Sequence, residues 1–253
     1  MNKIGIPFNK VHTTGAEAGN VQRIIEAGNL SAGDFTENCK AVMKAKYSFP
    51  ETIFTTSCTD ALELAALLLD IREGDEIIIP SYTFVSTANP FILRGAKIIF
   101  ADSSPDSPHI NAALVESLIT SRTKAIIVMH YGGILCDMDT ISAIAARYGL
   151  DIIEDAAHAL HAAFRGKVAG SFGRVAAFSF HFTKNITCGE GGMLVINDKS
   201  LVKRAGIISE KGTNRNEFLN GEVNKYDWVD VGSSFRLSEM HAAFLSGQLG
   251  KIE

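Results

Sequence analysis

The chain has 253 residues, of which 46% are hydrophobic and 21% charged, and its formal net charge is −4. This composition is that of an ordinary folded enzyme and argues against a disordered, fibrous or disulfide-stabilised protein. The chain has no strong excess of Lys and Arg, and no apolar run reaches the roughly 18 residues that a bilayer span needs, so neither nucleic acid nor a membrane is expected as a partner. The start of the sequence lacks the apolar centre of a signal peptide, and a cytoplasmic location is therefore expected.

From residue 52 onward, short apolar runs alternate with amphipathic stretches. The apolar runs are typical of strands buried on both faces, and the stretches between them are typical of helices. Strands are expected at 52–56, 75–80, 96–102, 124–131 and 150–157, with helices at 60–70, 84–95, 111–120 and 138–149. This alternation predicts an α/β fold with a mostly parallel sheet and helices on both faces.

The last third of the chain changes this pattern. Two apolar runs, at 174–181 and 191–198, are joined by a loop too short for a crossover helix, so at least one of them is expected to pair antiparallel and to make the sheet mixed. A helix is expected over 199–212, followed by a long polar loop over 213–236. Another helix starts at 237, and the chain ends without a capping signal. Residues 1–235 are thus expected to form a large domain with an N-terminal segment, and 236–253 to begin the connection to a C-terminal small domain that is absent from this chain.

The residues that follow each strand are the first candidates for a binding site, because open α/β sheets bind ligands beyond the carboxyl ends of their strands. Cys58 and Thr59 lie in a strand-to-helix turn, "TTSCTDALE", where free backbone N–H groups and the helix dipole favour a phosphate. An ordinary Ser or Thr helix cap would explain the same residues. No GxGxxG or GxxxxGK[ST] motif occurs there, which argues against dinucleotides and P-loop nucleotides.

An acidic group and a lysine follow two other apolar runs. Asp155 ends the strand at 150–157, and its spacing from His158 and His161 fits no common zinc motif, so no metal is expected. A carboxylate in such a water-poor place needs a cationic or hydrogen-bonding partner, such as a protonated ring nitrogen. Lys184 follows the run "AFSFHF"; most lysines are solvated surface charges, but one beside an apolar wall loses its proton more easily and becomes a nucleophile. A phosphate-holding turn, a carboxylate and such a lysine together indicate a pyridoxal phosphate site.

Five motifs carry a resemblance to a known family. In order and spacing, "TTSCTDALELAALLL", "PSYTFVSTAN", "IIEDAAHA", "FSFHFTKN" and "GEGGMLVIND" resemble the DegT/DnrJ/EryC1 family of sugar aminotransferases, and the likeness runs from about residue 5 to the last residue. The resemblance implies the large domain of an aspartate aminotransferase-like fold, pyridoxal 5'-phosphate (PLP) as cofactor, L-glutamate as amino donor and a homodimer with shared active sites. The segments "EKGTNRNEF" and "VNKYDWVDVGSSF" are most similar to members that act on a dTDP-linked keto sugar.

The resemblance also implies a role for each matching residue. Lys184 would hold the cofactor covalently, and Asp155 would partner its ring nitrogen. His158 would lie beside the ring hydroxyl, and Phe84 would pack on the ring face. The residues implied for the phosphate are Cys58, Thr59, Ser179 and, from the neighbouring subunit, Ser234, which stands where many relatives have asparagine.

The sequence gives fewer candidates for residues that bind the substrate. Lys211 and Arg215 are candidates for the nucleotide diphosphate, because Arg offers a planar fork to phosphate oxygens, but solvated loop charges explain them too. Two alternatives stay open: an aminotransferase for another nucleotide-linked keto sugar, and a non-catalytic binding or regulatory protein with the same fold. A sugar dehydratase of this fold is disfavoured, because such relatives have histidine where Lys184 stands.

Overall fold

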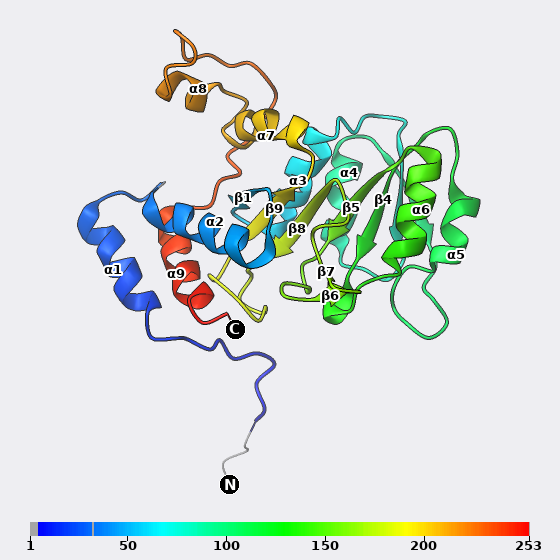
Figure 1. Cartoon of the computed structure of the whole chain (residues 1–253), viewed down its shortest axis with the longest axis horizontal. Coiled ribbons are helices and arrows are strands. Elements are labelled where there is room, and N and C mark those ends of the chain that lie inside the picture. Colours follow the sequence, from blue (N-terminus) through cyan, green and yellow to red (C-terminus); the bar gives the residue numbers. More distant parts are fainter. Residues whose placement is uncertain (1–4, 32, 253) are drawn as a thin grey trace.

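The computed structural model describes residues 5–31 and 33–252, which build a seven-stranded sheet with helices on both faces (Figure 1). A short two-stranded ribbon lies between β5 and β8 in the chain. The strands are β1 (Glu51–Thr55), β2 (Glu76–Pro80), β3 (Lys97–Ala101), β4 (Thr123–Met129), β5 (Asp151–Asp155), β6 (Ala163–Phe164), β7 (Lys167–Val168), β8 (Val175–Ser179) and β9 (Gly192–Ile196). Across the large sheet their order is β1, β9, β8, β5, β4, β2, β3.

The sheet is mixed, as predicted. Strands β8, β5, β4, β2 and β3 pair in parallel, whereas β9 pairs antiparallel with both β8 and β1. The loop between β8 and β9 contains no helix, so the chain returns beside the strand that it has just left. Since β1 and the parallel strands run the same way, their carboxyl ends lie along one edge of the sheet.

The helices vary in length from single turns to four turns. They are α1 (Glu17–Ala27), α2 (Asp34–Tyr47), α3 (Cys58–Leu68), α4 (Asn89–Leu93), α5 (Ala112–Val115), α6 (Met138–Tyr148), α7 (Val202–Ser209), α8 (Arg215–Leu219) and α9 (Glu239–Leu249). Four further turns are of the 3-10 type: η1 (Val85–Thr87), η2 (Glu116–Leu118), η3 (Tyr131–Gly133) and η4 (Lys199–Leu201).

Two predicted helices and one predicted loop need correction. Segment 84–95 divides into η1 and α4, with Pro90 in the first turn of α4, where its missing N–H costs no helical hydrogen bond. Segment 111–120 is helical only in α5 and η2, because the chain extends from Ile119 to reach β4. The predicted loop 213–236 contains α8 and isolated bridges, one of them between Thr213 and Trp228.

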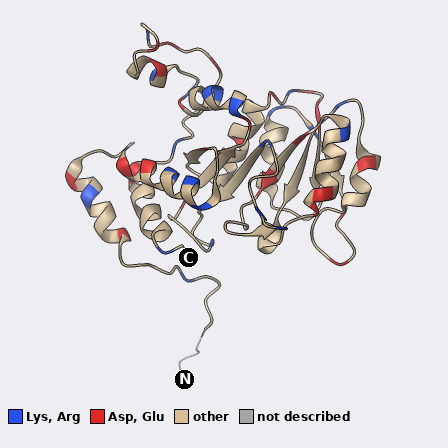
Figure 2. Cartoon of the chain, in the orientation of Figure 1, with Lys and Arg blue, Asp and Glu red and all other residues tan. Residues whose placement is uncertain are grey.

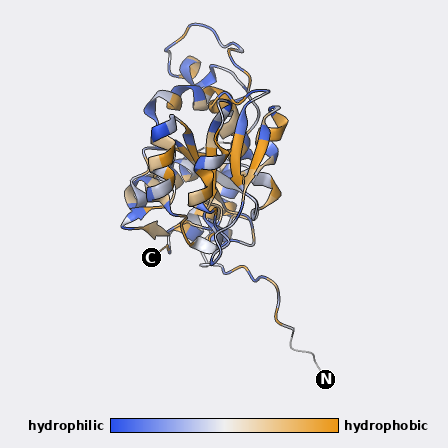
Figure 3. Cartoon of the chain, turned by 90° about the vertical axis from the view of Figure 1, so that its right-hand side faces the viewer, coloured by the Kyte–Doolittle hydropathy of each residue, from blue (hydrophilic) through white to orange (hydrophobic). Residues whose placement is uncertain are grey.

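The two faces of the sheet are covered by different helices. On one face, α3, α4 and α7 pack on alternate residues of the central strands, such as Ile77, Ile79 and Val175. On the other face, α2 and α9 cover β1, β9 and β8, while α5 and α6 cover β2 and β4. In the view of Figure 3 the hydrophobic colour gathers on the strands at the centre of the molecule. Burial on both faces explains why the strands read as continuous apolar runs.

Helix α9 packs against α1 and α2, and its residues Ala242, Leu245 and Leu249 join the core beneath the sheet. None of the helices formed by residues 5–31 and 33–252 has the length and apolar character that crossing a bilayer requires. Acidic and basic residues are interspersed over the outer helices and loops (Figure 2).

Candidate active site

A pocket of about 570 Å³ opens at the carboxyl edge of the parallel strands. Its walls come from the turns that follow β1, β2, β4, β5 and β8, so segments far apart in the sequence meet there. Seven of the predicted site residues line it: Cys58, Thr59, Phe84, Asp155, His158, Ser179 and Lys184.

The turn from β1 into α3 forms one side of the pocket. Ser57 caps α3, and its hydroxyl accepts a hydrogen bond from the Asp60 N–H at 3.0 Å. Cys58 and Thr59 are the first residues of the helix, so their amide N–H groups have no acceptor within it. The Thr59 hydroxyl donates to Ser86 at 2.8 Å and thereby joins this turn to η1. Free amides, hydroxyls and the positive end of an 11-residue helix suit a phosphate group.

Gly192 brings β9 directly against this turn. A Cβ atom at Gly192 would collide with the Ser57 carbonyl and with the Cys58 nitrogen. Only glycine therefore allows β9 to pack this closely against the turn between β1 and α3. Gly192 is the last residue of the motif "GEGG", and its missing side chain allows β9 to pack behind the turn between β1 and α3.

Asp155 lies buried at the end of β5. Its Oδ2 accepts a hydrogen bond from the Thr87 hydroxyl at 2.7 Å, and its Oδ1 accepts one from the Ala157 N–H at 3.2 Å. Burial raises the pKa of Asp155, and the bonds from Thr87 and Ala157 oppose that rise. A positively charged ring nitrogen beside this carboxylate would supply the ionic partner that the burial demands.

Lys184 lies half-buried in the turn after β8, where its N–H donates to the His181 carbonyl at 2.8 Å. Within residues 5–31 and 33–252 its ammonium group makes no hydrogen bond or ion pair. Burial lowers the pKa of Lys184, while Cys58 and Asp155 counteract that shift. The lowered pKa increases the fraction of free amine, which is the nucleophilic form. Burial also raises the pKa of the Cys58 thiol, so Cys58 acts there as a neutral small side chain.

His158 has a fixed tautomer in its neutral form. Its Nδ1 accepts a hydrogen bond from the Gly132 N–H at 3.2 Å, which leaves the proton on Nε2. Burial, followed by the charge of Lys184, lowers the pKa of His158. The ring therefore stays uncharged at neutral pH and offers one N–H donor.

Three predicted residues do not line this pocket. Ser234 is exposed and forms a bridge with Glu210, whereas Lys211 pairs with the Glu210 carboxylate at 3.1 Å. Arg215 begins α8, which projects away from the sheet in Figure 1. The structure thus brings the cofactor candidates of one chain together and leaves the substrate candidates outside.

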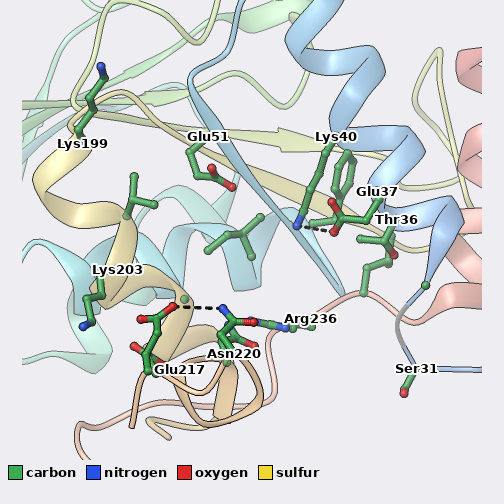
Figure 4. Close-up of a pocket in the computed structure, with 18 residues that line it drawn as sticks. Ser31, Thr36, Glu37, Lys40, Glu51, Lys199, Lys203, Glu217, Asn220 and Arg236 are labelled. Carbon is green, nitrogen blue, oxygen red and sulfur yellow. Dashed lines mark hydrogen bonds and ion pairs between the residues drawn. The ribbon is translucent and has the colours of Figure 1, made fainter. Parts of the chain in front are cut away.

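A larger groove of about 610 Å³ lies along the edge strand β1, between α2 and α7 (Figure 4). Its walls combine apolar residues with both acidic and basic ones, and some of the charges are paired, as Lys40 is with Glu37 at 2.9 Å. None of the predicted site residues, all of which the structure describes, lines this groove. Lysines beside an open edge strand are also a common protection against unwanted strand pairing.

Sequence reasoning missed several residues of the active-site pocket. Thr87, which holds Asp155, and Ser86, which holds Thr59, both lie in the motif "PSYTFVSTAN". A dense group of hydroxyls directly after a buried strand is the signal that could have identified them. The other lining residues that were not predicted include Tyr82, Tyr131, His181 and Glu190.

Solved structures share this architecture. Spr1654 of Streptococcus pneumoniae, described as a sugar aminotransferase and solved in its PMP form, is 26% identical over 98% of this chain and 68% of its own, with a TM-score of 0.90. PseC of Helicobacter pylori, an aminotransferase involved in the biosynthesis of pseudoaminic acid, is 26% identical over 96% of this chain and 64% of its own, with a TM-score of 0.86. AtS13 of Actinomadura melliaura is 29% identical over 99% of this chain and 69% of its own, with a TM-score of 0.92. This chain thus spans 64 to 69% of the length of these three proteins.

The sequence itself matches the DegT/DnrJ/EryC1/StrS aminotransferase family over residues 12–253. This match covers nearly the whole chain and includes every residue of the pocket. The chain therefore belongs to the DegT/DnrJ/EryC1/StrS aminotransferase family.

Proposed function

We propose that the protein is a PLP-dependent aminotransferase that moves the amino group of L-glutamate to the C4 keto group of a dTDP-4-keto-6-deoxyhexose. The product would be dTDP-4-amino-4,6-dideoxygalactose, a precursor of cell-surface polysaccharide such as enterobacterial common antigen. The observation that carries the proposal is the convergence of Lys184, Asp155 and the start of α3 on one pocket. Spr1654, a similar protein, has been solved in both PLP and PMP forms, which supports the cofactor.

The pocket residues fit this cofactor. The amides of Cys58 and Thr59, together with the Ser179 hydroxyl, would hold the phosphate, and Phe84 would pack on the ring. Asp155 would keep the proton on the ring nitrogen. When bound, PLP supplies an aldehyde that links covalently to amines and a ring that withdraws electrons from the carbon being deprotonated.

Lys184 has two tasks in this proposal. Its amine would hold the cofactor covalently until L-glutamate replaces it, and it would then carry the proton from the α-carbon of the amino donor. The lowered pKa suits both tasks, because each requires an amine that is free of its own proton. The Nε2–H of His158 would donate a hydrogen bond to the hydroxyl of the cofactor ring, and this bond would limit rotation of that ring.

The remaining predicted residues belong to a homodimer in this proposal. Ser234 lies outside the pocket of its own chain, so it would reach the phosphate in the neighbouring subunit. Lys211 and Arg215 would then bind the diphosphate of the nucleotide sugar. Both residues are exposed, although Lys211 pairs with Glu210, so a second copy would meet them at the surface.

The test is product analysis with purified protein, PLP, L-glutamate and dTDP-4-keto-6-deoxyglucose. Wild-type protein and Lys124→Ala, which changes an exposed lysine in β4, should form the amino sugar and 2-oxoglutarate. Lys184→Ala should lose at least about 1,000-fold in turnover, because it loses both the nucleophile and the proton carrier. Normal turnover by Lys184→Ala would disprove the catalytic role of Lys184. If wild-type protein transfers the amino group only to another nucleotide-linked keto sugar, that sugar is the acceptor instead. Binding of PLP without any turnover would favour the non-catalytic alternative.

A further inference from the structure

Three aromatic rings form a continuous wall on one side of the active-site pocket. Tyr82 contacts Tyr131 edge to face, with ring centroids 4.9 Å apart and an interplanar angle of 63°. Tyr131 contacts His158 in the same way, at 5.1 Å and 73°. All three residues line the pocket, and Tyr82 is 50% exposed. His158 has a proposed role beside the cofactor ring, whereas Tyr82 and Tyr131 have none.

The backbone holds Tyr131 firmly in this wall. Tyr131 begins the η3 turn directly after β4, and its carbonyl accepts hydrogen bonds from the Ile134 N–H and the His109 Nε2–H, both at 3.3 Å. His158, behind it, is tied to the same turn through Gly132. These contacts fix the backbone of Tyr131 and the ring of His158 before any ligand arrives, which lowers the entropy cost of binding.

The wall offers hydroxyl groups and aromatic faces but no permanent charge. The neighbouring Tyr82 phenol raises the pKa of Tyr131, so the Tyr131 phenol keeps its proton at neutral pH. Phenols can donate to and accept from the hydroxyls of a sugar, and ring faces can pack against its C–H groups. Ligand sites typically combine apolar aromatic surface with a few such polar groups.

The same features do not suit the amino donor. L-glutamate carries two carboxylates, which need cations or several N–H donors. A carboxylate, Glu190, also lines the pocket, with one oxygen 3.3 Å from the His181 Nε2. Its oxygens would accept hydrogen bonds from sugar hydroxyls. The aromatic wall and Glu190 thus supply partners for a hydroxylated ring, and none of them supplies the positive charge that a carboxylate needs.

We propose that Tyr82 and Tyr131 form the subsite for the sugar ring of the acceptor substrate. This inference rests on the proposed function, because it assigns residues to one of its two substrates. Tyr82, at the exposed end of the wall, packs on the sugar ring, and both hydroxyls bind sugar hydroxyls.

The experiment separates the two half-reactions by single-turnover absorbance measurements on Tyr82→Phe, Tyr131→Phe and Tyr82→Ala. The control is Tyr148→Phe, since Tyr148 is similarly exposed and donates to Glu116 at 2.8 Å outside the pocket. Each pocket variant to Phe should weaken binding of the keto sugar about 5- to 30-fold, the effect of one lost hydrogen bond. Tyr82→Ala should weaken it further, because it also removes the ring. The half-reaction with L-glutamate should change less than about twofold in every variant.

Two results would overturn the subsite: unchanged keto-sugar binding in all three pocket variants, or equal losses in both half-reactions. If wild-type protein transfers no amino group at all, the proposed function fails, and the subsite is then decided by calorimetry with dTDP-glucose. Binding of dTDP-glucose that Tyr82→Ala weakens at least about fivefold would support the subsite. Absent binding, or equal binding by wild type and variant, would overturn it.

Discussion

At the scale of single residues, the chemistry of the pocket depends on how Asp155 is held. Burial alone would favour the neutral carboxylic acid, which cannot stabilise a positively charged ring nitrogen. The Thr87 hydroxyl donates to the carboxylate at 2.7 Å and favours its ionised form. Thr87 in turn lies 2.6 Å from the hydroxyl of Thr83, so the motif after β2 contributes a small hydroxyl network rather than a single contact.

Replacing Thr87 by valine should therefore raise the pKa of Asp155 further. The ionised form would then be lost at a higher pH on acidification, so the acid limb of the kcat/KM profile should move up by about one pH unit. The measurement is the pH dependence of kcat/KM for L-glutamate. Thr140→Val is the control, because Thr140 donates to Asp137 at 2.6 Å outside the pocket and its loss should leave that limb unchanged. An unmoved limb in Thr87→Val would show that Thr87 does not control Asp155.

At the scale of elements, the start of α3 depends on its contact with β9. Gly192→Ala should push β9 away from the Ser57–Cys58 peptide, lower the free energy of unfolding by about 1 to 3 kcal/mol and weaken PLP binding. Gly206→Ala is the matched control: Gly206 lies in α7, and the nearest atom to an added Cβ is 3.7 Å away. Denaturant unfolding and PLP titration measure both effects. A Gly192→Ala protein as stable as wild type would contradict the close packing described here.

A second contact between elements links α1 to α9. The Glu17 carboxylate accepts from the Thr14 N–H at 2.8 Å, the Gly15 N–H at 3.0 Å and the Gln248 amide at 2.6 Å. Although burial opposes ionisation, these hydrogen bonds lower the pKa of Glu17 from 4.5 to about 2. Because the folded pKa is the lower one, this stabilisation is complete above pH 4.5 and is lost as the pH falls toward 2.

Glu17→Gln should accordingly destabilise the protein by about 1 to 3 kcal/mol at neutral pH and by much less near pH 2. The measurement is the free energy of unfolding from urea titrations across that range. Glu26→Gln, on the exposed side of α1, is the control and should change stability little. A constant difference between wild type and Glu17→Gln at every pH would exclude the proposed linkage.

At the scale of the whole molecule, the sequence predicts the architecture well because burial on both faces leaves a strong signal. The apolar runs locate β1, β2, β3, β4, β5, β8 and β9, and the short loop before β9 predicts its antiparallel pairing. Helices were harder to delimit. The break at Ala88, between η1 and α4, and the early end of α5 depend on how the chain must turn to enter the next strand.

The residues of the pocket likewise divide into those that the sequence predicts and those that it does not. Asp155, at the end of β5, and Lys184, in the turn after β8, are predicted from their positions relative to apolar runs. Thr87 and Tyr131 act through contacts with residues far away in the sequence, and these contacts exist only after the sheet has formed. The geometry of one chain also separates Ser234 from the pocket, so a role for it requires a second subunit.

Covalent attachment of the cofactor to Lys184 is the step on which the proposed function depends most directly. The most direct measurement is reduction of the PLP-loaded protein with borohydride, followed by digestion and mass spectrometry of the peptides. One pyridoxyl group is expected, attached to the peptide that contains Lys184. Attachment to any other lysine, or bound PLP that leaves no covalent label after reduction, would contradict it.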